Sequence, residues 1–411
     1  MELRRTLSGA LLILAMNLGI QDHLQAQVGI TAMPFLQINT QARSMGMAGA
    51  NVAMPHNQAG SNLNPAVIGS PGRLELSTQF MGLSSNTDFR LGTRWLPNYG
   101  SDLSFYMPSV HYSTSNWSFA YQYAHIDLED RRTPAQDPSA TKTYSLYEFS
   151  HTLSAAYRWN NYFSTGIGIN YVKSRPQVRI REEGVISAKK LTFDFGLYGA
   201  YPYTFDDRLK ITPSLGWSLT DFGSLVSYKD HYKDPLPIMM RGGMGLRLEY
   251  LDTFPGLPVI GENSPISIGL YRSYSKIMAR LENYTPPEQD ASSIEPMGPF
   301  KALFNSWDSY KYFNGQEVVS VSPGEQLMHH SGLEITLFDI LSYRRGFFRE
   351  DEHNGGRKYR TEGFGLHYKF ISLDYVEYIF DDRSHPLANT SYYQFTVSVP
   401  AKWLSSLPGN L

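Results

Sequence analysis

The sequence predicts an all-β protein: a transmembrane antiparallel β-barrel of about fourteen strands with an N-terminal plug, or hatch, of short helical turns. Three observations favour this class. The chain opens with a segment typical of an export signal, the remainder has no comparable apolar run, and stretches of alternating aromatic and small residues fill most of it. An exported chain without a membrane-spanning helix can still enter a bilayer as a closed barrel.

The first element is a predicted signal peptide over residues 1–26. Arg4 and Arg5 form a basic start, an interrupted apolar run extends from Leu7 to Ile20, and Ala26 is a small residue suited to cleavage. We therefore expect a cut near Ala26 and a final location in the outer membrane.

Composition limits the class further. The mean hydropathy of −0.33 disfavours a bundle of membrane helices, but only every second residue of a barrel strand faces lipid. Aromatic residues make up 14% of the 411 residues, and tyrosine, the commonest of them with 28 copies, suits a membrane interface. A tyrosine-rich soluble β-sandwich is the alternative.

The net charge of −2 gives no sign of nucleic-acid binding, and the absence of cysteine excludes disulfides, zinc thiolates and a lipidated cysteine anchor.

Residues 27–73 differ in amino-acid composition from the rest of the chain and form the predicted plug. They are rich in Gly, Ala, Met and Asn, and Asn64-Pro65 is a turn or helix-start signal. We expect one or two short helical turns that lie inside the barrel, because the apolar content is too high for a disordered tail. Arg43 stands among small residues, where a buried cation needs a carboxylate or carbonyl partner. Pinning the plug is favoured over ligand contact as its role.

The period changes to two from Leu74 onward, and residues 74–400 form the predicted barrel. In the run from Leu191 to Tyr203 the aromatic and aliphatic residues share one parity, and small or polar residues share the other. The small parity suits a lumen partly filled by a plug. Arg158 and Lys369 fall on this small parity, as expected if a lipid-facing cation costs about 2–4 kcal/mol.

Twelve to sixteen strands is the expected range for about fourteen candidate segments. These segments lie near residues 74–83, 103–113, 117–126, 144–159, 162–174, 178–188, 190–203, 209–219, 238–250, 264–275, 333–344, 359–370, 371–380 and 390–399. The longest loop covers about 276–331 and contains a possible helix near 300–310. Residues 401–411 form a C-terminal tail.

No constellation of residues predicts catalysis, a cofactor or a metal site. Asp351, Glu352 and His353 cluster beside two glycines and read as a solvated loop tip, and His329-His330 lacks the partner spacing of a zinc protease. There is no G-x-S-x-G nucleophile elbow. We expect a protein that is not an enzyme.

Both ends of the mature chain resemble the PorV/PorQ family of outer-membrane proteins. The N-terminal likeness is carried by Pro34–Ile38, Ala42–Ala50 and Asn64-Pro65-Ala66, and the C-terminal likeness by the stretch before the last candidate strand. The residues that carry it are Phe35, Leu36, Arg43, Gly46, Gly49, Asn64 and Pro65 in the plug, and Pro386, Leu387, Asn389 and Thr390 before that strand. Ala48, where a second glycine is usual, and Leu63, where an aromatic is common, depart from the pattern.

The resemblance implies a fourteen-stranded barrel of the long-chain fatty-acid transporter type, with an N-terminal hatch, in the outer membrane of a Bacteroidota-like bacterium. Its members serve the type IX secretion system. The implied partners are outer-membrane lipid or lipopolysaccharide, secreted proteins with C-terminal sorting domains, and a large translocon barrel or surface attachment subunits. The alternative is a channel or carrier for hydrophobic small molecules gated by the hatch; an open porin is disfavoured because the plug would obstruct diffusion.

Overall fold

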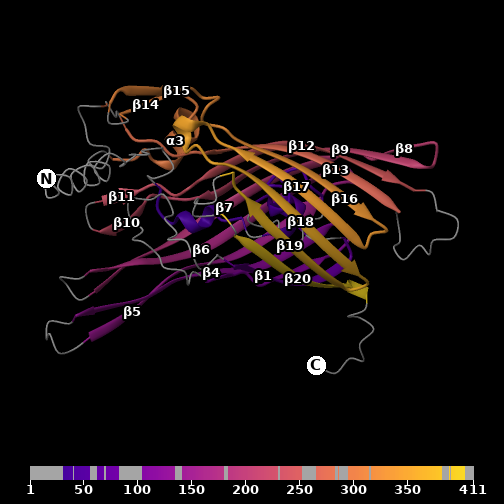
Figure 1. Ribbon diagram of the computed structural model, residues 1–411, viewed down its shortest axis with the longest axis horizontal. Coiled ribbons are helices and arrows are strands. Elements are labelled where there is room, and N and C mark those ends of the chain that lie inside the picture. The colour runs from indigo at the N-terminus through magenta and orange to yellow at the C-terminus, as the bar shows by residue number, and fades with distance from the viewer. Residues whose placement is uncertain are drawn as a thin grey trace, which may run out of the picture.

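Fourteen antiparallel strand positions close into a barrel within the part of the chain that this computed structural model describes (Figure 1). The structure describes residues 31–39, 41–55, 63–68, 71–82, 104–134, 141–179, 184–229, 232–251, 265–282, 286, 295–313, 316–381, 388 and 390–402. The predicted signal peptide, Pro386, Leu387, Asn389 and most of the predicted tail lie outside these residues.

Every wall strand is hydrogen-bonded to two neighbours, except the short β8, whose described pairing is with β9. The wall consists of β1 (Arg73–Gly82), β2 (Ser104–Tyr106), β3 (Ser109–Ser113), β4 (Trp117–Pro134), β5 (Thr141–Arg158), β6 (Phe163–Arg179), β7 (Gly184–Ala200), β8 (Tyr203–Phe205), β9 (Leu209–Phe222), β12 (Met239–Tyr250), β13 (Ile266–Ile277), β16 (Met328–Leu337), β17 (Leu341–Arg349), β18 (Lys358–Tyr368), β19 (Ile371–Ile379) and β20 (Ser391–Pro400). β1 pairs with β20 from Arg73↔Pro400 to Gly82↔Ser391, so the chain ends meet and the ring has no free edge.

Two of the strand positions are interrupted at a proline. β2 and β3 share one position and are separated by Met107 and Pro108, while β7 and β8 are separated by Tyr201 and Pro202. Proline has no amide hydrogen to donate to a neighbouring strand, so the ladder breaks there.

The expected strand number is confirmed, but two boundaries behind it are wrong. The segment predicted at 178–188 contains the end of β6 and the start of β7, and the segment predicted at 333–344 contains parts of both β16 and β17. The two errors cancel in the total. Their cause is a periodicity of two that continues through short turns and hides them.

The two ends of the barrel differ. At one end, here called the short-turn end, three residues connect β3 to β4 and three connect β16 to β17. The other, the long-loop end, carries β10 (Val226–Lys229), β11 (Tyr232–Asp234), α3 (Pro299–Asn305), β14 (Tyr310–Phe313), β15 (Val318–Val321) and the short η6 turn (Glu352–Asn354). These elements, except η6, are labelled together at the left of Figure 1. The helix expected near 300–310 is α3.

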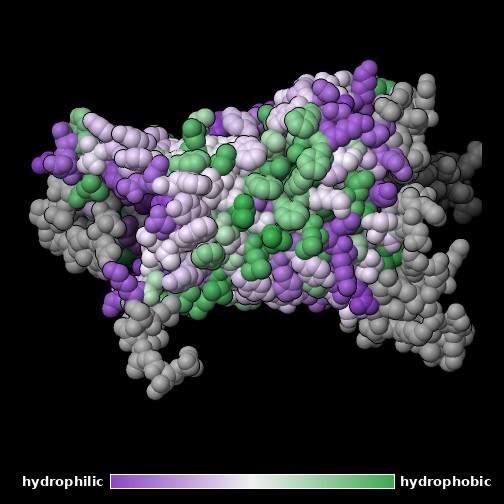
Figure 2. All heavy atoms as spheres, turned by 180° about the vertical axis from the view of Figure 1, so that it is seen from behind, coloured by the Kyte–Doolittle hydropathy of each residue, from purple (hydrophilic) through white to green (hydrophobic). Residues whose placement is uncertain are grey.

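The outward parity of the strands is apolar and exposed. Leu153 is 62% exposed and Leu215 is 65% exposed, and many outward aromatic side chains are about half exposed. Figure 2 shows hydrophobic side chains over the middle of one face, with hydrophilic ones toward both ends. Water-soluble monomers rarely expose an apolar surface larger than a few hundred Å², so this belt argues against the soluble sandwich.

Among the described residues, no helix is both long enough and apolar enough to cross a bilayer.

One of the two cations expected in the lumen is placed elsewhere. Lys369 lies in the turn between β18 and β19 with a φ of 54°, and its ammonium lies 5.2 Å from the centre of the Tyr368 ring. The predicted strand extended two residues too far into this turn. Arg158 is the last residue of β5 and donates to the Ser115 carbonyl at 2.8 Å, at the short-turn end.

The N-terminal segment lies inside the barrel, where it is drawn in indigo in Figure 1. It contains η2 (Pro34–Gln37), α2 (Ala42–Met45) and η4 (Pro65–Val67), three short helical turns. We call its described residues, 31–39, 41–55 and 63–68, the hatch.

Candidate functional site: the lumen and its hatch

The hatch crosses the lumen from one wall to the other. α2 contacts β18, β19 and β20, whereas η4 contacts β5, β6 and β7. In the order of strands around the ring, β6 and β18 lie seven positions apart, so they face each other across the barrel. The hatch is therefore held on both sides.

Wall glycines allow the hatch backbone to approach the strands. A Cβ atom at Gly196 would overlap Asn64, one at Gly166 would overlap the Pro65 carbonyl, and one at Gly346 would overlap the Ala48 amide. Only glycine fits at such positions. The small-residue parity of the sequence is thus the surface that receives the hatch.

Asn64 joins the η4 turn to the wall. Its Oδ1 accepts a hydrogen bond from the Ala66 amide at 3.0 Å, which caps the turn, and Pro65 starts the turn. Its Nδ2 donates to the Val52 carbonyl at 2.8 Å within the hatch and to the Leu197 carbonyl of β7 at 3.2 Å. One fully buried side-chain amide therefore supplies hydrogen-bond partners to backbone groups of both the hatch and a wall strand.

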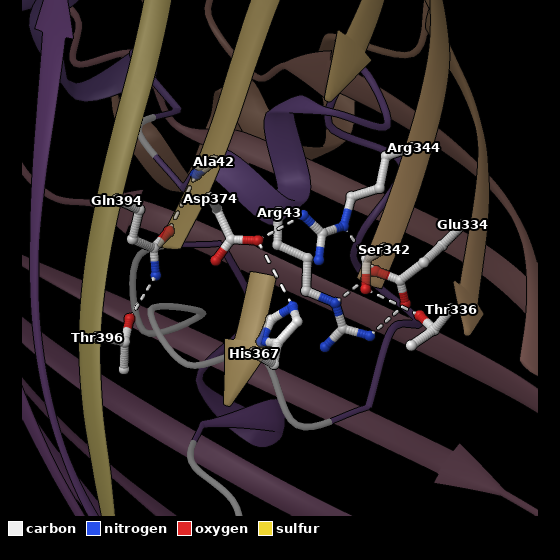
Figure 3. Close-up of polar contacts among 10 residues, drawn as sticks. All are labelled: Ala42, Arg43, Glu334, Thr336, Ser342, Arg344, His367, Asp374, Gln394 and Thr396. Carbon is white, nitrogen blue, oxygen red and sulfur yellow. Dashed lines mark hydrogen bonds and ion pairs between the residues drawn. The ribbon is translucent and has the colours of Figure 1, made fainter. Parts of the chain in front are cut away.

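Polar wall side chains supply further partners for the hatch backbone. The Ala42 amide donates to Gln394 Oε1 at 3.1 Å, and the Ala48 amide donates to Thr361 Oγ1 at 3.1 Å (Figure 3 shows the first). Three wall serines donate to hatch carbonyls on the opposite side: Ser164 to Ala66, Ser214 to Ala53 and Ser218 to Leu63. A buried segment with little regular structure needs such partners, because its amides and carbonyls cannot reach water.

An alternating chain of charges fastens α2 to the wall (Figure 3). Arg43 donates through Nε and Nη2 to both carboxylate oxygens of Glu334, at 2.8 and 2.6 Å. Arg344 donates to the same carboxylate at 2.8 Å and to Asp374 at 2.6 Å. His367 Nε2 lies 3.8 Å from Asp374. Two guanidinium groups and two carboxylates balance, so the charges can be buried together.

The balance keeps Arg43 charged. Burial lowers the pKa of its guanidinium, but the charge and hydrogen bonds of Glu334 act in the opposite direction and raise the pKa above its ordinary value. Arg344, on the wall side, is only 1% exposed. An arginine bound to a carboxylate in this bidentate geometry has a fixed orientation in addition to a charge partner.

His330 is a second wall contact of the hatch. Its Nδ1 lies 2.8 Å from the Ala48 carbonyl and its Nε2 lies 2.8 Å from Ser275 Oγ. A neutral ring that donates from Nδ1 and accepts at Nε2 satisfies both contacts. The neighbouring Gly49 has a φ of 79°, and a Cβ there would lie 3.1 Å from His330 Nδ1, so both conformation and space favour glycine.

The lumen changes in polarity along its length. Toward the short-turn end the inward residues are small and polar, for example Ser118, Ser154 and Ser398. Toward the long-loop end an apolar cluster stands beside a few buried polar residues such as Glu148, Ser174 and Lys276, and we call this cluster the apolar chamber. It is formed by Phe105, Ile126, Leu128, Leu146, Val172, Val376, Tyr378 and Tyr392 from the wall, Met33, Phe35 and Met45 from the hatch, and Leu236, Ile238 and Met278 from the loops.

A small cavity of about 20 Å³ lies where these two regions meet. Phe35, Leu36 and Ile38 line it from the hatch, and Asn170, Asp194 and Asp221 are among its wall residues. This volume holds about one water molecule. Toward the short-turn end a larger cavity, of about 730 Å³, separates Pro55 and Ala66 of the hatch from wall residues such as Tyr198 and Arg247. The described lumen is therefore open at the short-turn end and narrow at the small cavity beside η2.

Comparisons with known proteins give distant structural relatives. No protein-family model matches the chain, and no curated protein matches it. Among solved structures, it is similar to the toluene transporter TbuX of Ralstonia pickettii, with 11% identity, a TM-score of 0.42, and coverage of 88% of this chain and 97% of that one. It is also similar to the toluene transporter TodX of Pseudomonas putida, with 10% identity, a TM-score of 0.41, and coverage of 88% of this chain and 96% of that one. A FadL homologue of Pseudomonas aeruginosa is similar as well, with 10% identity, a TM-score of 0.38, and coverage of 91% of this chain and 100% of that one.

The sequence-predicted hatch residues occupy three places in the lumen. Phe35 and Leu36 lie at the apolar chamber, Arg43, Gly46 and Gly49 lie near β16 to β18, and Asn64 and Pro65 lie near β6 and β7. Of the predicted closing-strand residues, the described one is Thr390. It is buried, and its carbonyl accepts from the Tyr378 amide at 3.0 Å.

Two other polar clusters considered in the sequence have local roles. Asp351 accepts from the His353 amide at 3.0 Å and caps the η6 turn. His329 faces outward beside Tyr274, with ring centroids 5.1 Å apart, whereas His330 faces the hatch. No group of three or more potential metal ligands occurs in the described ranges.

Sequence reasoning did not single out Glu334, Arg344 or Asp374, and it considered His330 only as a metal ligand. A signal was present, because Glu334 and Asp374 are each the one acidic residue on the inward parity of their strand. Their pairing was not available, since it depends on which strands become neighbours around the barrel.

Proposed function

We propose that this protein is an outer-membrane barrel that carries hydrophobic small molecules, with the hatch as its gate. The observation that carries the proposal is the apolar chamber, which lies inside a barrel whose outer face is also apolar. A lumen for polar solutes has polar walls throughout. Here the chamber offers a hydrophobic molecule a site that excludes water, at the end of the barrel where the long loops lie.

Gating would involve the first part of the hatch. η2 has no side-chain cap, and its N-cap residue Met33 has a φ of 52°, in the left-handed region that non-glycine residues seldom adopt. α2 and η4 are instead fixed by the Arg43–Glu334 pair and by Asn64. A ligand that replaces Phe35 among the chamber residues would displace η2 while the remainder stays in place.

The test is transport into liposomes that contain the purified protein. A labelled monoaromatic hydrocarbon and a labelled long-chain fatty acid serve as probes; the first belongs to the same chemical class as toluene, which TbuX and TodX transport. Uptake above that of protein-free liposomes is expected, and Phe35→Ser should change its rate, whereas Phe304→Ser in the exposed α3 should not. Uptake equal to that of protein-free liposomes for both probes would reject the carrier function.

A second candidate function is that of an adaptor in type IX secretion, as the PorV/PorQ resemblance implies. A specific observation favours it: α3 exposes Phe300 (70%) and Phe304 (77%) on one face of the helix, and Trp307 follows (41%). Exposed aromatic side chains are enriched at the centres of protein interfaces. Secreted proteins with sorting domains, a translocon barrel or an attachment subunit would dock on this face.

The adaptor function is tested by surface display of a sorting-domain protein. Phe300→Ser with Phe304→Ser should reduce display and reduce recovery of partners from detergent-solubilised outer membrane. Lys301→Gln on the same helix is the matched control, because its contact is an exposed pair with Glu282 at 2.8 Å. Unchanged display with the double variant removes α3 from the mechanism.

A further inference from the structure

Two lysines face each other on the outer surface where the apolar belt ends. Lys173 of β6 and Lys189 of β7 are direct cross-strand partners, and both belong to the outward parity. Lys173 follows the outward Ile167, Ile169 and Tyr171, and Lys189 comes just before the outward Leu191. The pair therefore stands above the belt on its long-loop side.

A third cation completes the group, which we call the cationic cluster (Lys173, Arg175 and Lys189). Arg175 is the next outward residue of β6 and is paired with Tyr147 of β5. Its guanidinium lies 5.6 Å from the centre of the Tyr147 ring, and the Lys173 ammonium lies 5.1 Å from the same ring and donates to its hydroxyl at 2.8 Å. The aromatic ring thus holds two of the cations at one level.

The cluster has no anionic partner within the described residues. No ion pair to Lys173, Arg175 or Lys189 occurs there. Like charges directly opposite each other on neighbouring strands are destabilising. An external anion between them would replace that repulsion with attraction.

We propose that the cationic cluster binds a phosphate group of a phosphorylated glycolipid in the outer leaflet. The level of the cluster fits this ligand: acyl chains would lie against Ile169, Tyr171 and Leu191, and the headgroup phosphate would reach the two lysines. Long loops face the outside in barrels of this kind, so the cluster meets the outer leaflet. The inference rests on the proposed membrane placement and not on what the barrel carries.

The test measures lipid binding to the full-length protein in nanodiscs. Lipid A is compared with dephosphorylated lipid A, and bound lipid is counted by native mass spectrometry. Lys173→Gln and Lys189→Gln should each weaken binding of lipid A about fivefold, the effect of one basic residue near an anionic membrane surface. Lys369→Gln is the matched control, since Lys369 also lies over a tyrosine ring, at 5.2 Å, but at the short-turn end.

A stability measurement separates ligand binding from a folding defect. In lipid-free neutral detergent either glutamine variant should melt at or above the temperature of the unaltered protein, because repulsion is removed. Equal binding of phosphorylated and dephosphorylated lipid, or equal binding by the double variant, would overturn the proposal. Tight binding of inorganic phosphate alone would overturn it as well, because the ligand would then be a free anion. Transport of hydrophobic probes is scored separately, so either proposal can fail without the other.

Discussion

Arg43 of the hatch and Glu334 of β16 form a bidentate ion pair across 291 positions of sequence, with distances of 2.8 and 2.6 Å. Glu334 also accepts from Arg344, so the same carboxylate belongs to the wall network and to the hatch attachment. The wall network therefore remains when Arg43 is removed. This makes the attachment of the hatch separable, by mutation, from the stability of the barrel.

Replacing Arg43 with alanine should loosen the hatch and leave the barrel folded. Removing one partner of a buried ion pair typically costs about 3–5 kcal/mol, and here the remaining Glu334 keeps Arg344 as a partner, so the lower end is expected. Hydrogen exchange should become faster in residues 41–55, and single-channel recordings should show more frequent openings. Arg345→Gln, at the outward-facing neighbour of Arg344, is the control. Unchanged exchange in the hatch would mean that Arg43 does not hold it.

A methyl group on the inner wall should displace the hatch where it touches a strand. Gly196→Ala places a Cβ against Asn64, and overpacking of this kind costs about 1–3 kcal/mol. Gly242→Ala is the matched control, because a Cβ there meets no atom within 4 Å. The free energy of unfolding in urea should fall for the first variant and stay within error for the second. Equal values for both would show that the fit at Gly196 is not tight.

The barrel could be predicted from the sequence because its signal is local. Alternation along each strand separates the belt from the lumen, and this is visible in the run from Leu191 to Tyr203. The apolar chamber was not predicted, although the inward residues of β4 change from Ser118 and Gln122 to Ile126 and Leu128. The partners of Arg43 were not predicted either, because contacts between the hatch and β16 depend on closure of the whole ring. Turns were missed where neighbouring strands shared one periodicity.

The side-chain NH2 group of Asn64 should be needed for the hydrogen bond to the wall, whereas its side-chain oxygen should be sufficient to cap the η4 turn. Asn64→Asp keeps the oxygen that accepts from Ala66 and loses the two donations to Val52 and Leu197. It should therefore speed hydrogen exchange in residues 63–68 more than Asn160→Asp does in its own turn, because Asn160 uses its side-chain oxygen, which accepts from the Tyr162 and Phe163 amides. Asn64→Ala should lose the cap as well, at a further cost of about 1 kcal/mol. Equal effects of the two substitutions at Asn64 would show that the cap contributes nothing.

The loop that meets the start of the hatch should become less stable as the pH rises. Burial raises the pKa of Asp234 in β11 to about 6, and the next residue, Pro235, accepts a hydrogen bond from the Ala32 amide at 2.8 Å. Because the folded loop binds a proton more tightly than the unfolded loop, folding is favoured at low pH and this advantage is lost between about pH 4 and 6. Hydrogen exchange in β10 and β11 should therefore be slower, after correction for intrinsic rates, at pH 4 than at pH 7. Asp234→Asn should remove this dependence, and a pH profile that persists in the variant would assign it to another group.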